Sequence, residues 1–305
     1  MESSAEGEGV GRNLLNLRAA VTVESETGAM GDLRTDTSVD GSEGHYRATL
    51  SSDWQIWGPN GGYLTAVALR AAGIHSGLPR PASVLCHFLG VAEFAQVEIE
   101  VETLRLSRRA ESMRVSMKQD HRPILEALVW AVDEGMDGLE HDFADSPQVP
   151  GPDELASVDE LQKDSGGPRH WFFDNLEERP ISWIADYEHR PAGDPVHRCW
   201  YRFRPTPTFT DHWVDAGRLA IVVDTFQWPA ASRAYAAGSL DHIAPSLDLA
   251  CRFHRMEGTA DADWLLVEAR APIATEGLVG GTADVWDERG RLLASGGQQM
   301  LCRRN

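Results

Sequence analysis

The segment that most constrains the fold spans residues 61–74 and reads GGYLTAVALRAAGI. It is rich in good helix formers, and its residues are apolar on almost every helical face. A helix of this kind must be buried on all sides, so other elements must surround it. The turn Gly58-Pro59-Asn60 precedes the helix, and residues 45–50 before that turn have strand character.

The segments after this helix have the two-residue periodicity of antiparallel strands. Residues 83–89 form a first strand, and residues 97–106 alternate apolar side chains with glutamates. The alternation returns at residues 113–117, and residues 124–132 form a last strand after an Asp-His-Arg-Pro turn. A sheet that is apolar on one face and wraps a single helix buries both elements at once.

The second half of the chain repeats this order of elements. Residues 218–237 supply an apolar helical segment that we expect to stop at Pro229, and residues 246–253 match residues 83–88 in character. A hairpin region and a last strand follow, at residues 264–286 and 291–303. Two similar blocks in the same order predict an internal duplication.

The spacing between matched residues is nearly constant along the two halves. Phe253 follows Phe88 by 165 residues, and Leu292 follows Ile124 by 168. Two stretches do not belong to either block. Residues 1–35 are rich in Gly, Ser and Glu and are predicted to be a disordered tail. Residues 137–167 hold nine acidic residues against one lysine and are predicted to be a solvated linker. The expected domains are therefore 36–136 and 168–305.

The charge of the chain limits its partners. A net charge of −19 over 305 residues argues against nucleic acid or an anionic membrane surface, because both select for basic patches. A few local arginines or a helix N-terminus could still bind a phosphate. The longest apolar stretch is too short to span a bilayer, no secretory signal is visible, and the four cysteines form no CxxC pair. These features predict a cytoplasmic protein with reduced thiols.

Several motifs occur in an order that points to a known family. The second half contains SLDLACRFHR, DWLLVEARAP, GLVGG and DERGRLLASGGQQ, and the first half contains GGYLTAVALRAA and SVLCHFL. Together they resemble the TesB-like (type II) acyl-CoA thioesterases over residues 45–135 and 200–303. The resemblance implies an α+β fold, a tandem (double) hotdog in which each antiparallel sheet wraps around a central helix. It also implies an acyl-CoA substrate and no cofactor, and it is compatible with a homo-oligomer.

The resemblance further implies a hydrolytic site made of an Asp, a hydroxyl residue and a Gln around a water molecule. By motif these fall on Asp224, Ser246 and Gln298, with Gln299 as the alternative for the glutamine. The first half would complete the substrate site through Trp57 and the helix start at Gly61 and Gly62.

Thioester hydrolysis needs an activated water and a stabilised carbonyl oxygen. Asp224 lies in the apolar run IVVDTF, where burial would raise its pKa and make it a better base. Ser246 and Gln298 could position the water through neutral hydrogen bonds, and backbone N–H groups near the start of the second central helix could bind the oxyanion. Alternatively, Asp224 could be paired with Arg218 or Arg233, Ser246 could be a plain strand residue, and Gln298 could belong to a turn.

Other chemistry is less well supported by the sequence. No HExxH or similar spacing predicts a metal site, and no Gly-x-Ser-x-Gly motif predicts an α/β-hydrolase. Asp40 and His45 have the spacing of hotdog hydratases, but their polar, Gly-rich surroundings predict a loop. Trp54 and Trp228 could line an acyl pocket or simply belong to the core. A non-catalytic acyl-binding module and an enoyl-CoA hydratase remain the alternatives to a thioesterase.

Overall fold

The computed structural model describes residues 31–163, 170–186, 189–237, 239–256 and 261–304. The strands of the first half are β1 (Asp40–Ser42), β2 (His45–Thr49), β3 (Arg80–Phe88), β4 (Gln96–Leu106), β5 (Ala110–Gln119) and β6 (Arg122–Val132). Those of the second half are β7 (Leu176–Pro180), β8 (Val196–Phe203), β9 (His242–Ile243), β10 (Asp248–Phe253), β11 (Leu265–Thr275), β12 (Leu278–Trp286), β13 (Leu292–Leu301) and β14 (Arg303–Arg304).

Twelve of these strands form one continuous antiparallel sheet. Their order is β1-β2-β4-β5-β6-β3-β10-β13-β12-β11-β8-β7, while β9 and β14 pair separately. The helices are α1 (Leu33–Asp36), α2 (Gly61–His75), α3 (Val158–Leu161), α4 (His212–Thr225) and α5 (Gln227–Ser232). Three short 3-10 turns accompany them, at Ser52–Trp54, Pro152–Glu154 and Trp171–Asn175.

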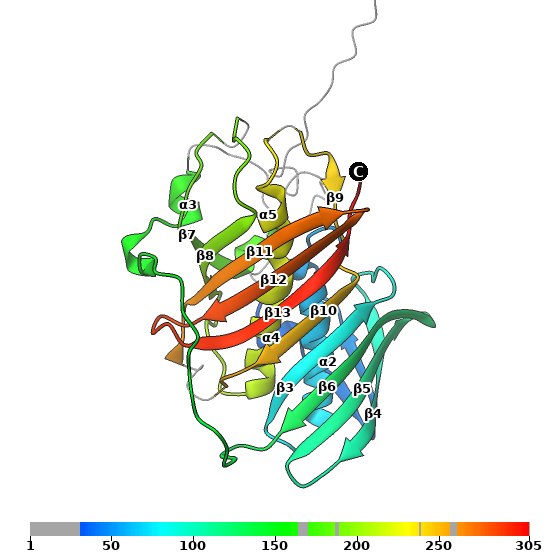
Figure 1. Cartoon of the computed structure of the whole chain (residues 1–305). Helices are drawn as coiled ribbons and strands as arrows, with labels where there is room; N and C mark the ends of the chain where they lie inside the picture. Colours follow the sequence, from blue (N-terminus) through cyan, green and yellow to red (C-terminus); the bar gives the residue numbers. More distant parts are fainter. Residues whose placement is uncertain (1–30, 164–169, 187–188, 238, 257–260, 305) are drawn as a thin grey trace, which may run out of the picture.

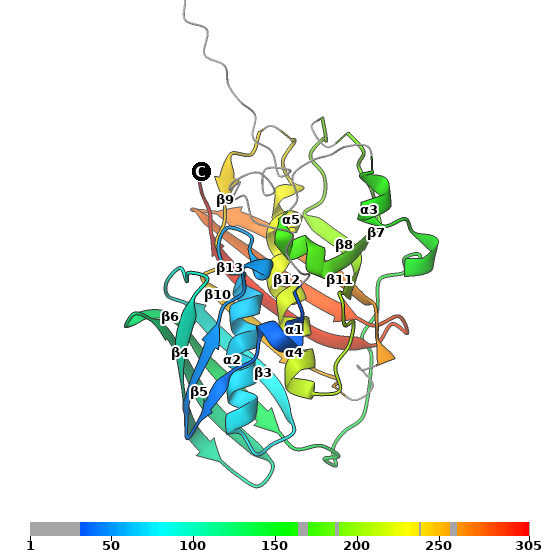
Figure 2. The same ribbon diagram turned by 180° about the vertical axis from the view of Figure 1, so that it is seen from behind.

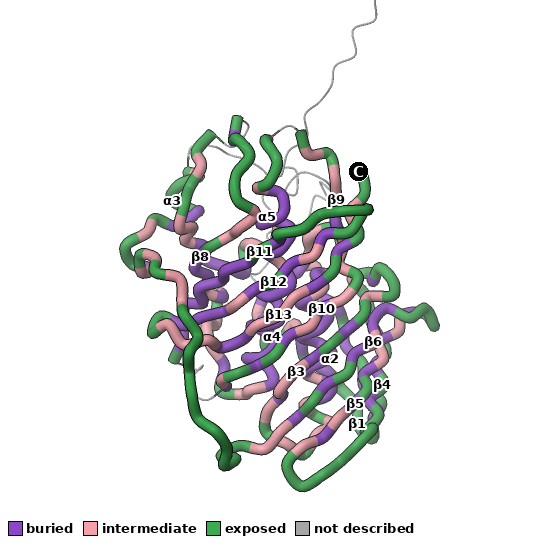
Figure 3. The backbone as a smooth tube through the Cα atoms, viewed as in Figure 1, coloured by how far each residue is buried: buried purple, intermediate pink, exposed green. Residues whose placement is uncertain are grey.

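The two long helices, α2 and α4, lie side by side on one face of the sheet (Figures 1 and 2). Each half of the sheet curves around its own helix, so the structure confirms the predicted tandem hotdog. The same helices are almost entirely buried, as Figure 3 shows. The helix predicted at residues 61–74 is therefore α2, and it is buried on nearly every face for the reason its composition suggested.

The two halves join at the middle of the sheet through β3 and β10. Leu85 and Ala250, which are related by the same 165-residue offset as Phe88 and Phe253, face each other in the middle of the paired stretch. The last strands differ slightly from expectation. Leu128 of β6 faces Leu85, and Gly297 of β13 faces Ala250, which gives an offset of 169 instead of 168.

The helices α2 and α4 are antiparallel and approach closely because small residues lie at their contact. A Cβ atom on Gly62 would lie 2.5 Å from the Cα of Ile221, and one on Gly217 would lie 2.8 Å from the Cβ of Ala66. The start of α2 is thereby brought against the end of α4 (Figure 2). This contact places residues from the two halves of the chain next to one another.

The second helix differs from the prediction in its bounds. It begins at His212 instead of residue 218, because the carboxylate of Asp211 accepts hydrogen bonds from the N–H groups of Trp213 and Val214 and so caps the helix. Pro229 does not end it. Pro229 lies in the first turn of the separate helix α5, where its missing N–H costs no hydrogen bond.

Several strands were not predicted, among them β7 and β8. Their alternation is obscured because the outer face of the second half is also buried, in a cluster of Trp200, Trp264, Leu266 and Trp286. Side chains that pack on this cluster include Val149 and Leu155, which come from the stretch predicted as a linker. That stretch carries no helix or strand from residue 133 to 151, and it follows the edge of the molecule (Figure 1).

Two N-terminal predictions can be compared with the structure. Residues 1–30 of the predicted tail lie outside the described residues, and Leu33–Asp36 form α1. The Asp40-to-His45 stretch was predicted as a loop. It is instead a β-hairpin, in which Asp40 and His45 are exposed on β1 and β2 and the positive φ of Glu43 and Gly44 closes the turn. None of the described helices has the length and apolar character needed to cross a membrane.

Candidate active site

Asp224 lies in the last turn of α4, and only 5 % of its surface is exposed. One carboxylate oxygen, Oδ2, accepts hydrogen bonds from the backbone N–H of Gly62 (2.9 Å) and from Nδ2 of Asn60 (3.2 Å). The other oxygen, Oδ1, lies 3.1 Å from the hydroxyl of Ser246. The carboxylate therefore links the end of one central helix to the beginning of the other.

Ser246 and Gln298 meet beside this carboxylate. Ser246 precedes β10, and its Oγ lies 2.9 Å from Oε1 of Gln298. The amide nitrogen of Gln298 donates to the main-chain carbonyl of Asp224 (2.9 Å), which fixes Oε1 toward Ser246. Gln299 instead points to the exposed face of β13, because neighbouring residues of a strand face opposite sides. The structure thus brings Asp224, Ser246 and Gln298 together, with Gln298 as the inward glutamine.

The protein environment raises the pKa of Asp224. Burial disfavours the charged carboxylate and outweighs the hydrogen bonds from Gly62, Ser246 and Asn60, so the pKa rises from 3.8 to about 6. The alternative explanation of a buried ion pair does not hold for Arg218, which pairs with Asp215 at 2.9 Å. Among the described residues Asp224 forms no salt bridge, so its charge is balanced by hydrogen bonds alone.

Asn60 is the member of this site that the sequence prediction missed. Its Oδ1 accepts a hydrogen bond from the N–H of Tyr63 (3.0 Å), which makes it the N-cap of α2. Its Nδ2 reaches Asp224 and also the hydroxyl of Thr225 (3.2 Å). An Asn directly before a helix start is a recognisable capping signal, but the partner in α4 lies 164 residues away and leaves no local trace.

The oxyanion donors were predicted near the start of the second central helix, and this placement is wrong. That start lies at Asp211, whereas Asp224 ends the helix, roughly 20 Å away at 1.5 Å per residue. The helix start beside Asp224 belongs to α2. There, the N–H of Gly61 has no acceptor among the described residues, while the next two N–H groups bind Asp224 and Asn60.

Gly61 packs closely against the carboxylate and the ring of Phe88, with no room for a side chain. A Cβ atom at this position would lie 3.1 and 3.2 Å from the two oxygens of Asp224 and 2.9 Å from the ring of Phe88. Trp57, predicted to bind substrate, lies in the segment before α2 with 42 % of its surface exposed. It takes no part in the hydrogen bonds that join Asp224 to its neighbours. Trp54 and Trp228 are both buried members of the core.

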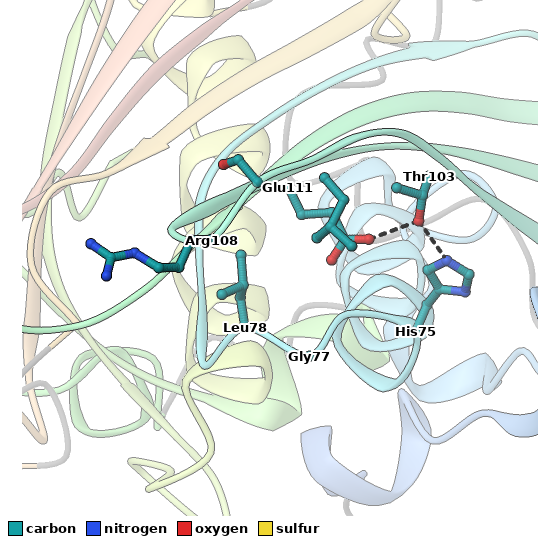
Figure 4. Close-up of a pocket in the computed structure, with 8 residues that line it drawn as sticks. His75, Gly77, Leu78, Thr103, Arg108 and Glu111 are labelled. Carbon is teal, nitrogen blue, oxygen red and sulfur yellow. Dashed lines mark hydrogen bonds between the residues drawn. The ribbon is translucent and has the colours of Figure 1, made fainter.

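A separate hollow of about 750 Å³ opens at the opposite end of α2. Figure 4 shows His75 and Thr103 on one side of it, with the Thr103 hydroxyl between the His75 ring (2.9 Å) and the buried carboxylate of Glu111 (2.7 Å). None of the predicted site residues lines this hollow. In the described part of the chain, no group of three or more His, Cys, Asp or Glu side chains is arranged to hold a metal ion.

Comparisons with known proteins agree with this architecture. Residues 50–132 match the family model of the acyl-CoA thioesterase N-terminal domain, and residues 149–302 match that of the acyl-CoA thioesterase C-terminal domain. No curated protein matches the chain. Similar solved structures include a hot dog fold protein from Alicyclobacillus acidocaldarius, with 20 % identity, a TM-score of 0.74 and coverage of 90 % of this chain and 98 % of that one.

Two mycobacterial structures are about as similar to this chain as that protein is. The acyl-CoA thioesterase II TesB2 of Mycobacterium marinum has 20 % identity and a TM-score of 0.71, with 90 % of this chain and 99 % of that one covered. A tesB protein of Mycobacterium avium subspecies paratuberculosis has 18 % identity and a TM-score of 0.71, with 90 % and 100 % covered. These likenesses support the fold, and the C-terminal model alone spans half of the sequence. The chain therefore belongs to the acyl-CoA thioesterase family.

Proposed function

We propose that this protein hydrolyses an acyl-CoA thioester to a free acid and CoA, with Asp224 as the general base. The observation that carries the proposal is the meeting of one buried carboxylate, free of any described ion pair, with the polar side chains of Ser246 and Gln298. A pKa of about 6 leaves Asp224 ionised at neutral pH and still basic enough to accept a proton from water.

The proposed reaction requires no covalent intermediate. Asp224 removes a proton from a water molecule while the water oxygen bonds to the thioester carbonyl carbon, and the carbonyl π electrons move onto oxygen. The tetrahedral intermediate then collapses. Its C–S bond breaks, the sulfur takes the electron pair, and the proton held by Asp224 passes to the departing CoA thiolate. Water is the only co-reactant.

The hydroxyl of Ser246 has one proton and two acceptors within reach. When Asp224 is ionised, Ser246 donates to Asp224, and Oε1 of Gln298 is free to accept a hydrogen bond from water. When Asp224 is protonated, it can donate to Ser246, which then donates to Gln298. Protonation of the base therefore occupies the acceptor that orients the water, and deprotonation releases it.

The first half of the chain supplies the oxyanion site in this proposal. The N–H of Gly61 lies at the positive end of the α2 dipole and has no acceptor among the described residues. A substrate carbonyl oxygen that develops negative charge would be stabilised there. Gly61, Gly62 and Trp57 are accordingly our candidates for substrate binding, and a side chain at position 61 would crowd the Asp224 carboxylate.

The direct test is the release of free thiol from a panel of acyl-CoAs. We expect the wild-type protein to release thiol with at least one acyl length and Asp224→Asn to lower kcat/KM by 10²–10⁴-fold, roughly the contribution of a general base. Asp211→Asn is the matched control. It changes the same residue type at the other end of α4, and Asn is an equally good N-cap.

Each alternative function gives a different result. Loss of the enoyl absorbance of crotonyl-CoA without thiol release would indicate a hydratase. Tight binding of acyl-CoA with neither reaction would indicate a non-catalytic module. Thiol release that Asp224→Asn leaves intact would remove Asp224 from the mechanism.

A further inference from the structure

We propose that Asn60 is a positioning residue of this site, which holds one oxygen of Asp224 so that the other oxygen, Oδ1, is the atom that accepts the proton. This inference rests on the proposed function, because it concerns the same base. It assigns to Asn60 a role beyond that of a helix cap, and it assigns different roles to the two oxygens of one carboxylate.

The orientation of the Asn60 amide is determined by its neighbours. The N–H of Tyr63 donates to one end of the amide at 3.0 Å, so that end is the oxygen. The NH₂ group must then face away from α2, toward Asp224 and Thr225. The hydroxyl of Thr225 donates to the carbonyl of Ile221 (2.7 Å), so its oxygen is available as an acceptor for Asn60. The side chain is 7 % exposed, and both of its ends are occupied.

The two oxygens of Asp224 consequently differ. Oδ2 accepts two N–H groups, from Asn60 and Gly62, and both of those donors are fixed by α2. Oδ1 has one neighbouring donor, the hydroxyl of Ser246, which can rotate toward Gln298 instead. A carboxylate oxygen with fewer hydrogen bonds is the better proton acceptor. Oδ1 is also the oxygen on the side of Ser246 and Gln298, where the water is proposed to lie.

Few other groups act on this carboxylate. The polar groups that bond to it come from two elements: the α2 start (Asn60 and Gly62) and the segment before β10 (Ser246). Gln298 of β13 bonds to the main-chain carbonyl of Asp224 instead. The nearby thiol of Cys86 is neutral, because burial raises its pKa to about 12. Asp248 also acts on Cys86, but it is partly exposed and accepts a hydrogen bond from the N–H of Gln299. The Asn60 donor is therefore one of the few influences that lower the pKa of Asp224 against burial.

Two substitutions separate positioning from capping. Asn60→Ser retains an N-cap oxygen of about equal strength but has no N–H for Asp224. Asn60→Asp also retains the cap and places a second carboxylate beside Oδ2. Thermal melting of both variants shows whether the cap survives, and the pH profile of kcat/KM for thiol release reports the pKa of the base.

We expect Asn60→Ser to melt near the wild-type temperature, to lower kcat roughly 10-fold and to change KM less than about twofold. The acidic limb of its kcat/KM pH profile should move to higher pH by roughly 0.5–1 unit, which corresponds to the free energy of one lost hydrogen bond. Asn60→Asp should move the limb further in the same direction, because a like charge disfavours ionisation of Asp224. Hydrolysis by Asn60→Ser with the kcat and pH profile of the wild type would overturn the proposal and leave Asn60 as a cap only.

The outcome can be distinguished from a failure of the proposed function. An active Asp224→Asn variant would remove the base itself and with it any need for positioning. An inactive Asp224→Asn variant beside a fully active Asn60→Ser variant would contradict only the role of Asn60. A rise in KM with unchanged kcat would show that Asn60 contacts the substrate, which also contradicts positioning.

Discussion

The two ends of the paired central helices share one arrangement, in which the N-cap of one helix contacts the other helix. They differ in the side chains that make the contact. At one end the N-cap of α2, Asn60, reaches across to Asp224 of α4. At the other end the N-cap of α4, Asp211, reaches across to Arg70 of α2 at 2.8 Å. The two caps lie 151 positions apart, and the same offset relates Asp224 to Gly73.

At the second end, Gly73 is the position that corresponds to Asp224. A Cβ atom there would lie 2.5 Å from the ring of Trp213, so the indole occupies the space beside it. The strand offsets relate Ser246 to Pro81 and Gln298 to Val129, neither of which carries a side-chain hydrogen-bonding group. One end of a duplicated scaffold therefore holds a polar site, and at the other end the indole of Trp213 fills the equivalent place. Both halves therefore have the same arrangement of helix and strands, but only one end carries the polar side chains of the candidate site.

The largest stability effect is expected at the filled end. Trp213→Ala should lower the free energy of unfolding by about 3–5 kcal/mol, because it removes a buried indole from the helix contact. Thiol release per folded molecule should stay within about twofold of wild type. Chemical denaturation measures the first effect and a thioester assay the second, with the 39 % exposed Trp183 changed to Ala as control. A loss of activity as deep as that of Asp224→Asn would show that the two ends are not independent.

At the polar end, Asp224→Asn should make the protein more stable while removing activity. The folded protein raises the pKa of Asp224 from 3.8 to about 6, so ionisation at neutral pH costs stability. The folded protein binds the proton of Asp224 more tightly than the unfolded chain does. The resulting gain in the free energy of unfolding is complete below pH 3.8 and is lost as the pH rises through about 6. The gain from Asn should therefore be on the order of 2–3 kcal/mol above pH 7 and should vanish near pH 4. Equal gains at both pH values would mean that folding does not raise the pKa of Asp224.

The close helix contact can be tested with a matched pair of glycines. Gly62→Ala should destabilise the protein by about 1–3 kcal/mol, because its Cβ would push against the backbone of Ile221. Gly77→Ala meets nothing within 4 Å and should change stability by roughly 0.5 kcal/mol or less. Comparable effects at the two positions, measured by thermal unfolding, would show that the α2–α4 contact is looser than described.

The smallest effect is expected from Ser246→Ala. It removes one hydroxyl donor from the site, so kcat/KM should fall by roughly 3–10-fold. Ser295→Ala is the control, because Ser295 is on β13 and bonds to His254 on the opposite face. A loss as large as that of Asp224→Asn would instead assign Ser246 a direct part in the proton transfer.

Several parts of the fold could be predicted from the sequence because they depend on local periodicity. The all-apolar segment at 61–74 became α2, and the alternation at residues 97–106 became β4. Alternation also explains why Gln298 faces inward and Gln299 outward. The strand β8 escaped prediction because the outer face of its sheet is covered as well, which removes the alternation on which the prediction depends.

The sequence by itself determined the duplicated architecture, the family resemblance and the identity of Asp224, Ser246 and Gln298 as candidates. Only the tertiary structure decided that the start of α2, and not that of α4, faces Asp224, and that Asn60 belongs to the site. The reason is physical. Periodicity and capping act over a few residues, whereas the site is closed by the antiparallel packing of two helices whose meeting residues lie more than 150 positions apart in the chain.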